Sequence, residues 1–274
     1  MKSDSDALSA LAPLSAVRSR SWQGAATLIS KVGQPLAAAA LVLIAWEALV
    51  RAYDIRPVIL PTPSAIVVAT YSQWHTLLSN AVPTALESLA GFIISVVAGG
   101  LLGILLTFSR IARDALYPNV VLFQLIPKVA VAPLFMLWLG IDWHSRVAIA
   151  VFVAFFPIVI STVSGLNAVD DNLLRLCRSL TATQTQIFFK VRLPSSLPFL
   201  FNGMKISMTL AIIGVIVGEF VTSQRGLGYI ILFAGSRLET ALVLAAILVL
   251  CIVGLLLYGL VALAERLIMT KYGS

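Results

Sequence analysis

The chain has 274 residues, of which 59% are hydrophobic and only 11% are charged, and its formal net charge is +7. Soluble domains carry about 25% charged residues, so this composition excludes an ordinary soluble protein and makes the lipid bilayer the solvent to consider. The basic excess does not indicate nucleic-acid binding, because Lys and Arg gather in the short connections between apolar runs, as they do in membrane proteins.

The two ends of the chain are polar. Residues 1–34 are rich in Ser, Ala and Arg and lack an apolar core followed by a small-residue cleavage site, so we do not expect a secretory signal there. We expect 1–34 to be a poorly ordered cytoplasmic extension and 267–274 to be a short cytoplasmic tail. The region between them, 35–266, is predicted to be the transmembrane domain.

Apolar segments of membrane-spanning length follow one another through this domain. Each is near the roughly 20 residues that a spanning helix needs. The sequence therefore predicts an all-α, polytopic membrane protein with about six transmembrane helices, surrounded by membrane lipid. The predicted spans are 35–53, 84–108, 116–140, 145–166, 197–222 and 240–264.

The distribution of basic residues predicts the orientation. Connections on the side of the N-terminus hold more Lys and Arg, among them Arg110, Arg113, Lys190 and Arg266, than connections on the other side. Basic connections stay in the cytoplasm. We therefore expect a multi-pass protein of the bacterial cytoplasmic membrane with both termini inside.

The third predicted span contains Pro118, Pro127 and Pro133. Proline removes a helix hydrogen bond and kinks the axis, and a broken helix in lipid persists where protein or a cavity surrounds it. We therefore expect a kinked helix at 116–140 that faces the protein interior.

Small residues recur four apart in two spans. Gly99 and Gly103 form one pair, and Gly214 and Gly218 form another. This spacing lets helix backbones approach closely. The contact could join two copies of the chain or two helices of one chain, and intrachain packing is the favoured interpretation.

A long polar stretch, 170–195, interrupts the apolar spans. Its apolar residues recur at helical spacing, and Thr181 and Thr183 are each followed three residues later by a glutamine, Gln184 and Gln186, as in a capping box. Pro194 is expected to end the second helix. The stretch is thus predicted to be a helix–turn–helix on the cytoplasmic face. Physical reasoning leaves open whether it rests on lipid or docks a protein partner.

This stretch carries a family resemblance. "RLCRSLTATQTQIFFKVRLPSSLPFLFNGMKIS" (175–207) resembles the cytoplasmic loop of binding-protein-dependent ABC importer permeases, in which Glu-Ala-Ala is followed by a Gly and then by Leu-Pro. "IPKVAVAPLFMLWLGI" (126–141), "VGEFVTSQRGLGYII" (217–231) and "LPTPSAI" (60–66) are similar to the nitrate, sulfonate and taurine branch of these permeases.

The resemblance implies a type I ABC importer permease fold and several partners. These are two cytoplasmic ATP-binding subunits, an extracytoplasmic substrate-binding protein and a second permease copy, with a homodimer expected. It also implies that 170–195 couples the permease to the ATPase, with the turn near Ser179, Thr181 and Ala182. The coupling residues implied are Arg175, Arg178, Ser179, Thr181, Ala182, Gln184 and Pro194.

The loop departs from the family pattern at two positions. Arg175 stands where the family has Glu, which reverses the charge at the expected ATPase contact, and Thr181 stands where the family has Gly. We expect Thr181 to cap the second helix instead.

The motifs that are missing bear on the energy source. The sequence has no G-x-x-x-x-G-K-[ST] phosphate loop, so ATP-driven transport would need a separate ATPase. Cys177, Cys251, His75 and His144 fit no metal site or cofactor, and both histidines are expected in outside loops. The alternatives are a secondary transporter driven by an ion gradient, although no internal repeat is visible, and an intramembrane enzyme, for which no catalytic set is apparent.

Charged residues within the apolar spans are candidates for the substrate pathway. A charge near the bilayer centre costs roughly 2.5–3.5 kcal/mol on insertion scales, so it faces the protein interior or water. We expect Lys128 to line the pathway and favour an anionic or polar solute, such as a sulfonate, taurine, nitrate or a vitamin precursor. Glu219 is expected to pair with Arg225 and brace the outer gate, although purely structural roles are also open.

Overall fold

The computed structural model describes residues 15–222 and 224–272. The described part of the chain is 87% helical and contains no strand. It divides into two compact units, Met1–Ala65 and Ile66–Ser274. The all-α fold class is confirmed. Five helices are long and apolar enough to cross a membrane among the described residues, or up to six if one bent pair counts as a single span.

The first unit is built around α1, Ser15–Ala52, of which Gly33–Ala52 is apolar enough to span a membrane. Only 6% of that window is buried, so the side chains of Gly33–Ala52 are largely exposed. The helix begins at Ser15, so position 34 is not an element boundary, and the predicted extension lies outside the described residues only for 1–14. A short helix, α2 (Pro63–Ser72), follows and runs into the second unit.

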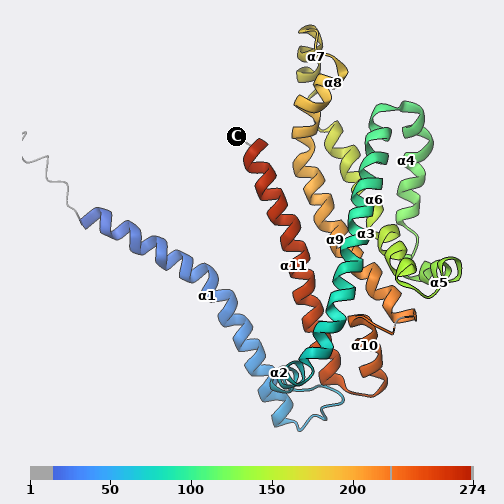
Figure 1. Cartoon of the computed structure of the whole chain (residues 1–274). Helices are drawn as coiled ribbons and strands as arrows, with labels where there is room; N and C mark the ends of the chain where they lie inside the picture. Colours follow the sequence, from blue (N-terminus) through green and yellow to red (C-terminus); the bar gives the residue numbers. More distant parts are fainter. Residues whose placement is uncertain (1–14, 223, 273–274) are drawn as a thin grey trace, which may run out of the picture. The chain divides into compact units, whose positions relative to one another are not determined.

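The second unit is a bundle in which α3, α6 and α9 pack together, with α10 and α11 against α9 (Figure 1). In the figure, α7 and α8 lie at one end of this unit and α10 lies at the opposite end. The helices of the unit are α3 (Trp74–Phe108), α4 (Arg110–Gln124), α5 (Lys128–Leu139), α6 (Trp143–Asn167), α7 (Asp171–Ser179), α8 (Gln184–Ile187), α9 (Leu193–Thr222), α10 (Leu227–Ser236) and α11 (Thr240–Tyr272).

Small residues allow the central helices to lie close together. A Cβ on Gly103 would come within 2.5 Å of the Thr162 Cβ, and one on Gly99 would lie 3.0 Å from Ile158, so this pair packs α3 on α6. Gly214 likewise faces the Ala150 backbone at 2.7 Å, which packs α9 on α6. The preferred prediction of intrachain packing is confirmed at these glycines.

The kink predicted for the span at 116–140 is confirmed, and the helix is broken there. The span consists of two helices, α4 and α5, whose axes are bent by 103°. The break falls at residues 125–127, just before Lys128, where Pro127 has an extended backbone and cannot donate a hydrogen bond to the end of α4. Pro118 and Pro133, by contrast, lie inside their helices.

Other boundaries also differ from the predictions. The helix that contains the second span begins at Trp74, ten residues before position 84. His75 therefore lies in the first turn of α3. His144 lies in the first turn of α6, so neither histidine is in a loop. At the C-terminus, α11 continues to Tyr272 through most of the predicted tail. Only residues 273–274 of that tail lie outside the described part.

Pro194 does not end a helix. The π-helical turn Phe188–Arg192 connects α8 to α9, and Leu193 N–H donates to the Phe188 carbonyl in the five-residue spacing of a π turn. Pro194 therefore lies in the first turn of α9, where proline is tolerated because it needs no N–H donor there. The widened turn gives the proline ring room in a continuous helical path.

Candidate functional site

The α7–α8 hairpin, residues 171–187, projects from one end of the bundle. Asp170 caps α7 by accepting a 2.7 Å hydrogen bond from Asn172 N–H. Leu174 and Ile187 are buried against each other with Val169, and Cys177, Ala182 and Val191 are packed around them. This small core fixes the two helices as one rigid element, as the helix–turn–helix prediction requires.

The turn of the hairpin is a Schellman motif. Thr181 N–H donates to the Arg178 carbonyl at 3.0 Å, and Ala182 N–H donates to the Cys177 carbonyl at 3.0 Å. In this motif the residue after the helix adopts the left-handed conformation that favours glycine, and Thr181 does so with φ 59°. The family's Gly at this position is thereby explained, and Thr181 keeps the turn with a strained β-branched residue.

The second helix of the hairpin is capped by Thr183, not Thr181. Thr183 Oγ1 accepts a 3.3 Å hydrogen bond from Gln186 N–H, and Gln186 Oε1 accepts one of 2.8 Å from Thr183 N–H. This reciprocal pair is the predicted capping box. The alternative box, Thr181 with Gln184, is wrong because the left-handed Thr181 already belongs to the end of α7.

The hairpin presents an outer surface with apolar and basic groups. Arg175, Arg178, Ser179, Thr181 and Gln184 are exposed, whereas Ala182 and Pro194 are half-buried. Leu180, at the turn, is 71% exposed. A hollow of about 340 Å³ lies beside the turn; it is lined by Cys177, Leu180, Thr181, Ala182, Gln186, Ile187, Lys190 and Val191. Exposed apolar side chains around a hollow indicate a contact surface.

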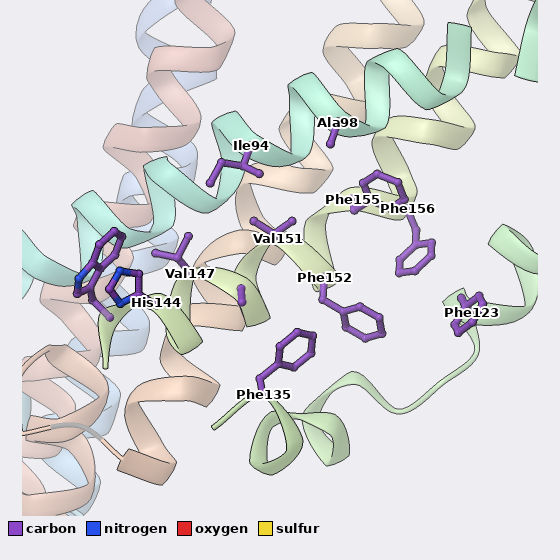
Figure 2. A pocket seen from close by; sticks show the side chains of 12 residues that line it. Ile94, Ala98, Phe123, Phe135, His144, Val147, Val151, Phe152, Phe155 and Phe156 are labelled. Carbon is purple, nitrogen blue, oxygen red and sulfur yellow. The ribbon is translucent and has the colours of Figure 1, made fainter. Parts of the chain in front are cut away.

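A second candidate region is an apolar hollow of about 740 Å³ beside α6. Figure 2 shows the rings of Phe152, Phe155 and Phe156 on α6, with Phe123 of α4 and Phe135 of α5 across from them. Lys128 is half-buried near this wall. Its Nζ lies 5.8 Å from the centre of the Phe156 ring, within range of a cation–π contact.

Glu219 has partners other than the expected Arg225. It is 1% exposed, and its Oε1 accepts a 2.6 Å hydrogen bond from Thr84 Oγ1 while Oε2 accepts one of 2.7 Å from Gly228 N–H. Arg225 lines a neighbouring hollow of about 440 Å³ that also includes Glu87 and Arg146. The C-terminal end of α9 is thus held to α3 and α10.

The sequence reasoning missed an ion pair between Glu87 of α3 and Arg146 of α6. Arg146 Nε donates to Glu87 Oε2 at 2.7 Å and Arg146 Nη2 donates to Oε1 at 2.5 Å, a bidentate geometry. Both side chains are about nine-tenths buried. Both residues fall within predicted apolar spans, Glu87 in 84–108 and Arg146 in 145–166, so a charge within an apolar span was the signal that could have found them.

Within residues 15–222 and 224–272, no three His, Cys, Asp or Glu side chains are grouped as a metal site would require. The geometry is that of a helix bundle with an exposed hairpin at one end and a polar cluster at the other, which suits a transport component.

Comparison with known proteins decides the family. The family model described as "Binding-protein-dependent transport system inner membrane component" matches residues 95–270, more than half of the chain. The chain belongs to this family. It is thus a multi-pass inner-membrane permease of the ABC importer type, in which the ATPase is a separate subunit, and the resemblance is confirmed. A transporter driven by an ion gradient is not favoured.

Curated relatives align over most of the chain. Formylaminopyrimidine transport permease protein ThiX of Halalkalibacterium halodurans is 32% identical over 230 residues, covering 84% of this chain and 92% of that protein. Riboflavin transport system permease protein RibX of Chloroflexus aurantiacus is 35% identical over 233 residues, covering 83% and 86%. Taurine transport system permease protein TauC of Escherichia coli is 28% identical over 236 residues, covering 83% and 86%.

A solved structure agrees in fold. A chain of the MetNI methionine ABC transporter, in an inward-facing conformation, is 23% identical and superposes with a TM-score of 0.57. The match covers 73% of this chain and 98% of that chain. At this identity the similarity establishes the fold of the permease and no more.

Proposed function

We propose that this permease imports a small anionic or polar solute by alternating access and that the α7–α8 hairpin couples it to the ATPase. The observation that carries the coupling role is the hairpin itself: a rigid element at one end of the bundle with exposed Leu180 at its turn. An exposed apolar group on such an element suits a protein groove better than water. The assembly is then two permease copies, as a homodimer, with two ATP-binding subunits and a binding protein.

The proposed orientation places the hairpin and both termini in the cytoplasm. The hairpin and the π turn that follows it carry Arg175, Arg178, Lys190 and Arg192 within a short stretch of sequence, which supports this placement by the positive-inside rule. The α10 end then faces the binding protein. Reporter fusions after Ser109 should report cytoplasm and fusions near Asp142 should not, and a consistently inverted pattern would contradict the docking role.

The experiment for coupling uses the exposed residue at the turn. Leu180→Asp should leave the permease inserted and folded, because Leu180 is exposed, but should reduce ATP-driven uptake in vesicles that contain the ATPase and the binding protein at least about tenfold. Leu180→Met is the matched control, because it keeps an apolar side chain at the same exposed position of the turn. Equal uptake by both variants would refute docking at the turn.

The proposed solute class rests on the relatives and on Lys128. The relatives are described as transporting a formylaminopyrimidine, riboflavin and taurine, all small and polar. Lys128 at the start of α5 supplies a cation beside the aromatic wall of α6 and supports passage of an anionic or polar group. The role of Glu219 and Arg225 at the outer gate remains part of this proposal.

Lys128→Met tests whether the lysine serves transport. It should leave the amount of folded permease in the membrane nearly unchanged and impair uptake, since methionine keeps the apolar stem and removes the charge. Loss of folded protein would instead make Lys128 structural. No effect on either would show that it does not face the pathway.

A further inference from the structure

The N-terminus of α10 is held by side chains from two other helices. Gly226 N–H donates to Asn80 Oδ1 at 2.8 Å, Leu227 N–H donates to Thr84 Oγ1 at 2.9 Å, and Gly228 N–H donates to Glu219 Oε2 at 2.7 Å. The first N–H groups of a helix have no partner within it and must find one elsewhere. Here consecutive groups are satisfied by α3 and α9. We call Asn80, Thr84 and Glu219 the α10 clamp.

Thr84 and Glu219 also bind each other, so the clamp is continuous. Thr84 Oγ1 accepts from Leu227 N–H, and its single hydrogen has two acceptors within reach, Glu219 Oε1 at 2.6 Å and the more distant Asn80 carbonyl at 3.1 Å. Both side chains are buried, Thr84 at 0% exposed and Glu219 at 1%. The carboxylate at the start of α10 is further favoured by the positive end of the helix dipole.

The glycines of the segment are required by the clamp. Gly226 has φ 105°, which other residues rarely adopt, and a Cβ there would overlap the Glu219 carboxylate. A Cβ on Gly228 would lie 2.9 Å from Glu219 Oε2. The backbone therefore approaches the carboxylate as closely as atoms allow, and the position of α10 depends on the length and shape of Glu219.

The helix that is clamped is too short to cross the membrane. α10 is an apolar helix of 10 residues, packed against α9 and α11, and buries Leu227, Ile230 and Ala234. A half-spanning helix needs a fixed anchor, because its N-terminal N–H groups would otherwise be unsatisfied at membrane depth. The clamp supplies that anchor where α3 and α9 meet.

We propose that Glu219 is a positioning residue for transport: through the clamp it makes α3, α9 and α10 move as one body, which closes the outer end of the permease until the ATPase acts. This role rests on the proposed import by alternating access. It goes beyond the expected Glu219–Arg225 brace, because Glu219 also binds Thr84 and the backbone of α10.

The first test measures the position of α10 directly and needs no transport. In a chain with Cys177→Ser and Cys251→Ser, the change Ala234→Cys places a thiol at a site that is 0% exposed. The purified permease in nanodiscs should react slowly with a membrane-impermeant maleimide. Adding Thr84→Val, which keeps the side-chain shape and removes the hydroxyl, should speed labelling at least about tenfold, and Thr84→Ser should restore the slow rate.

Glu219→Gln provides a second perturbation and Glu239→Gln its control. Glu239 is an exposed glutamate just after α10, so neutralising it changes net charge equally without touching the clamp. Labelling should rise for Glu219→Gln alone. If Thr84→Val and Glu219→Gln label no faster than Glu239→Gln, the clamp does not set the position of α10 and the proposal is overturned.

The second test asks whether that position matters for transport. With the ATPase and binding protein present, solute imported per ATP hydrolysed should fall at least fivefold for Thr84→Val and be normal for Thr84→Ser and Glu239→Gln. Faster labelling with an unchanged ratio would overturn the positioning role while leaving the clamp intact. An unmodified permease that imports nothing with ATP would refute the proposed function, and labelling alone would then decide whether the clamp holds α10.

Discussion

Glu87 and Arg146 should contribute to the free energy of unfolding as a strongly coupled pair. Each side chain is about 10% exposed, and the guanidinium and carboxylate share two hydrogen bonds between α3 and α6. Removing one partner leaves the other charge buried and uncompensated, which costs about 3–5 kcal/mol. For a chain of this size, each kcal/mol of lost stability lowers the melting temperature by about 2–4 °C, so Glu87→Leu or Arg146→Met should lower it by about 6–20 °C.

The double variant separates the pair from the individual residues. Replacing both partners by apolar side chains removes both buried charges, so Glu87→Leu with Arg146→Met should lose much less stability than the two single changes added together. The assay is thermal unfolding of the purified permease in nanodiscs, followed by tryptophan fluorescence. Trp143 lies in the first turn of α6, one turn from Arg146, and is well placed to report.

A more exposed ion pair in the same bundle serves as the control. Lys205 of α9 pairs with Glu265 of α11, and these side chains are 20% and 24% exposed. In the same comparison of single and double variants, the coupling free energy of Lys205 and Glu265 should be smaller than that of the buried pair, because solvent screens their charges. Additive losses for Glu87 and Arg146, or a coupling no larger than that of the control pair, would refute the argument from burial.

Two further changes test local features of the fold. Thr181→Gly should relieve the strain of the left-handed backbone at the hairpin turn by about 1 kcal/mol. Hydrogen exchange in α7 and α8 should become slower while uptake is retained. Unchanged or faster exchange would count against the Schellman assignment. Gly103→Ala should destabilise the permease by about 1–3 kcal/mol, because the added Cβ would meet Thr162. Gly100→Ala is the control and should be neutral, because Gly100 faces open space. Equal melting temperatures for the two variants would contradict the close α3–α6 contact.

Features that depend on residues close together along the chain could be predicted from the sequence. Apolar length identified the membrane-spanning helices, since crossing a bilayer is a property of one continuous segment. The Thr183–Gln186 capping box was predictable because both partners lie within one turn. The glycines spaced four residues apart predicted close contacts between helices, but the sequence did not identify their partner residues on α6.

Contacts between residues far apart in the sequence could be identified only from the structure. Thr84 and Glu219 are 135 positions apart, and Glu87 and Arg146 are 59 apart, so no local pattern links them. The sequence suggested Arg225 for Glu219 because it is close along the chain, whereas the contacts of the carboxylate with Thr84 and with the start of α10 come from the helix path. A buried charge binds the groups that packing places beside it, and in a helical bundle those groups belong to other helices.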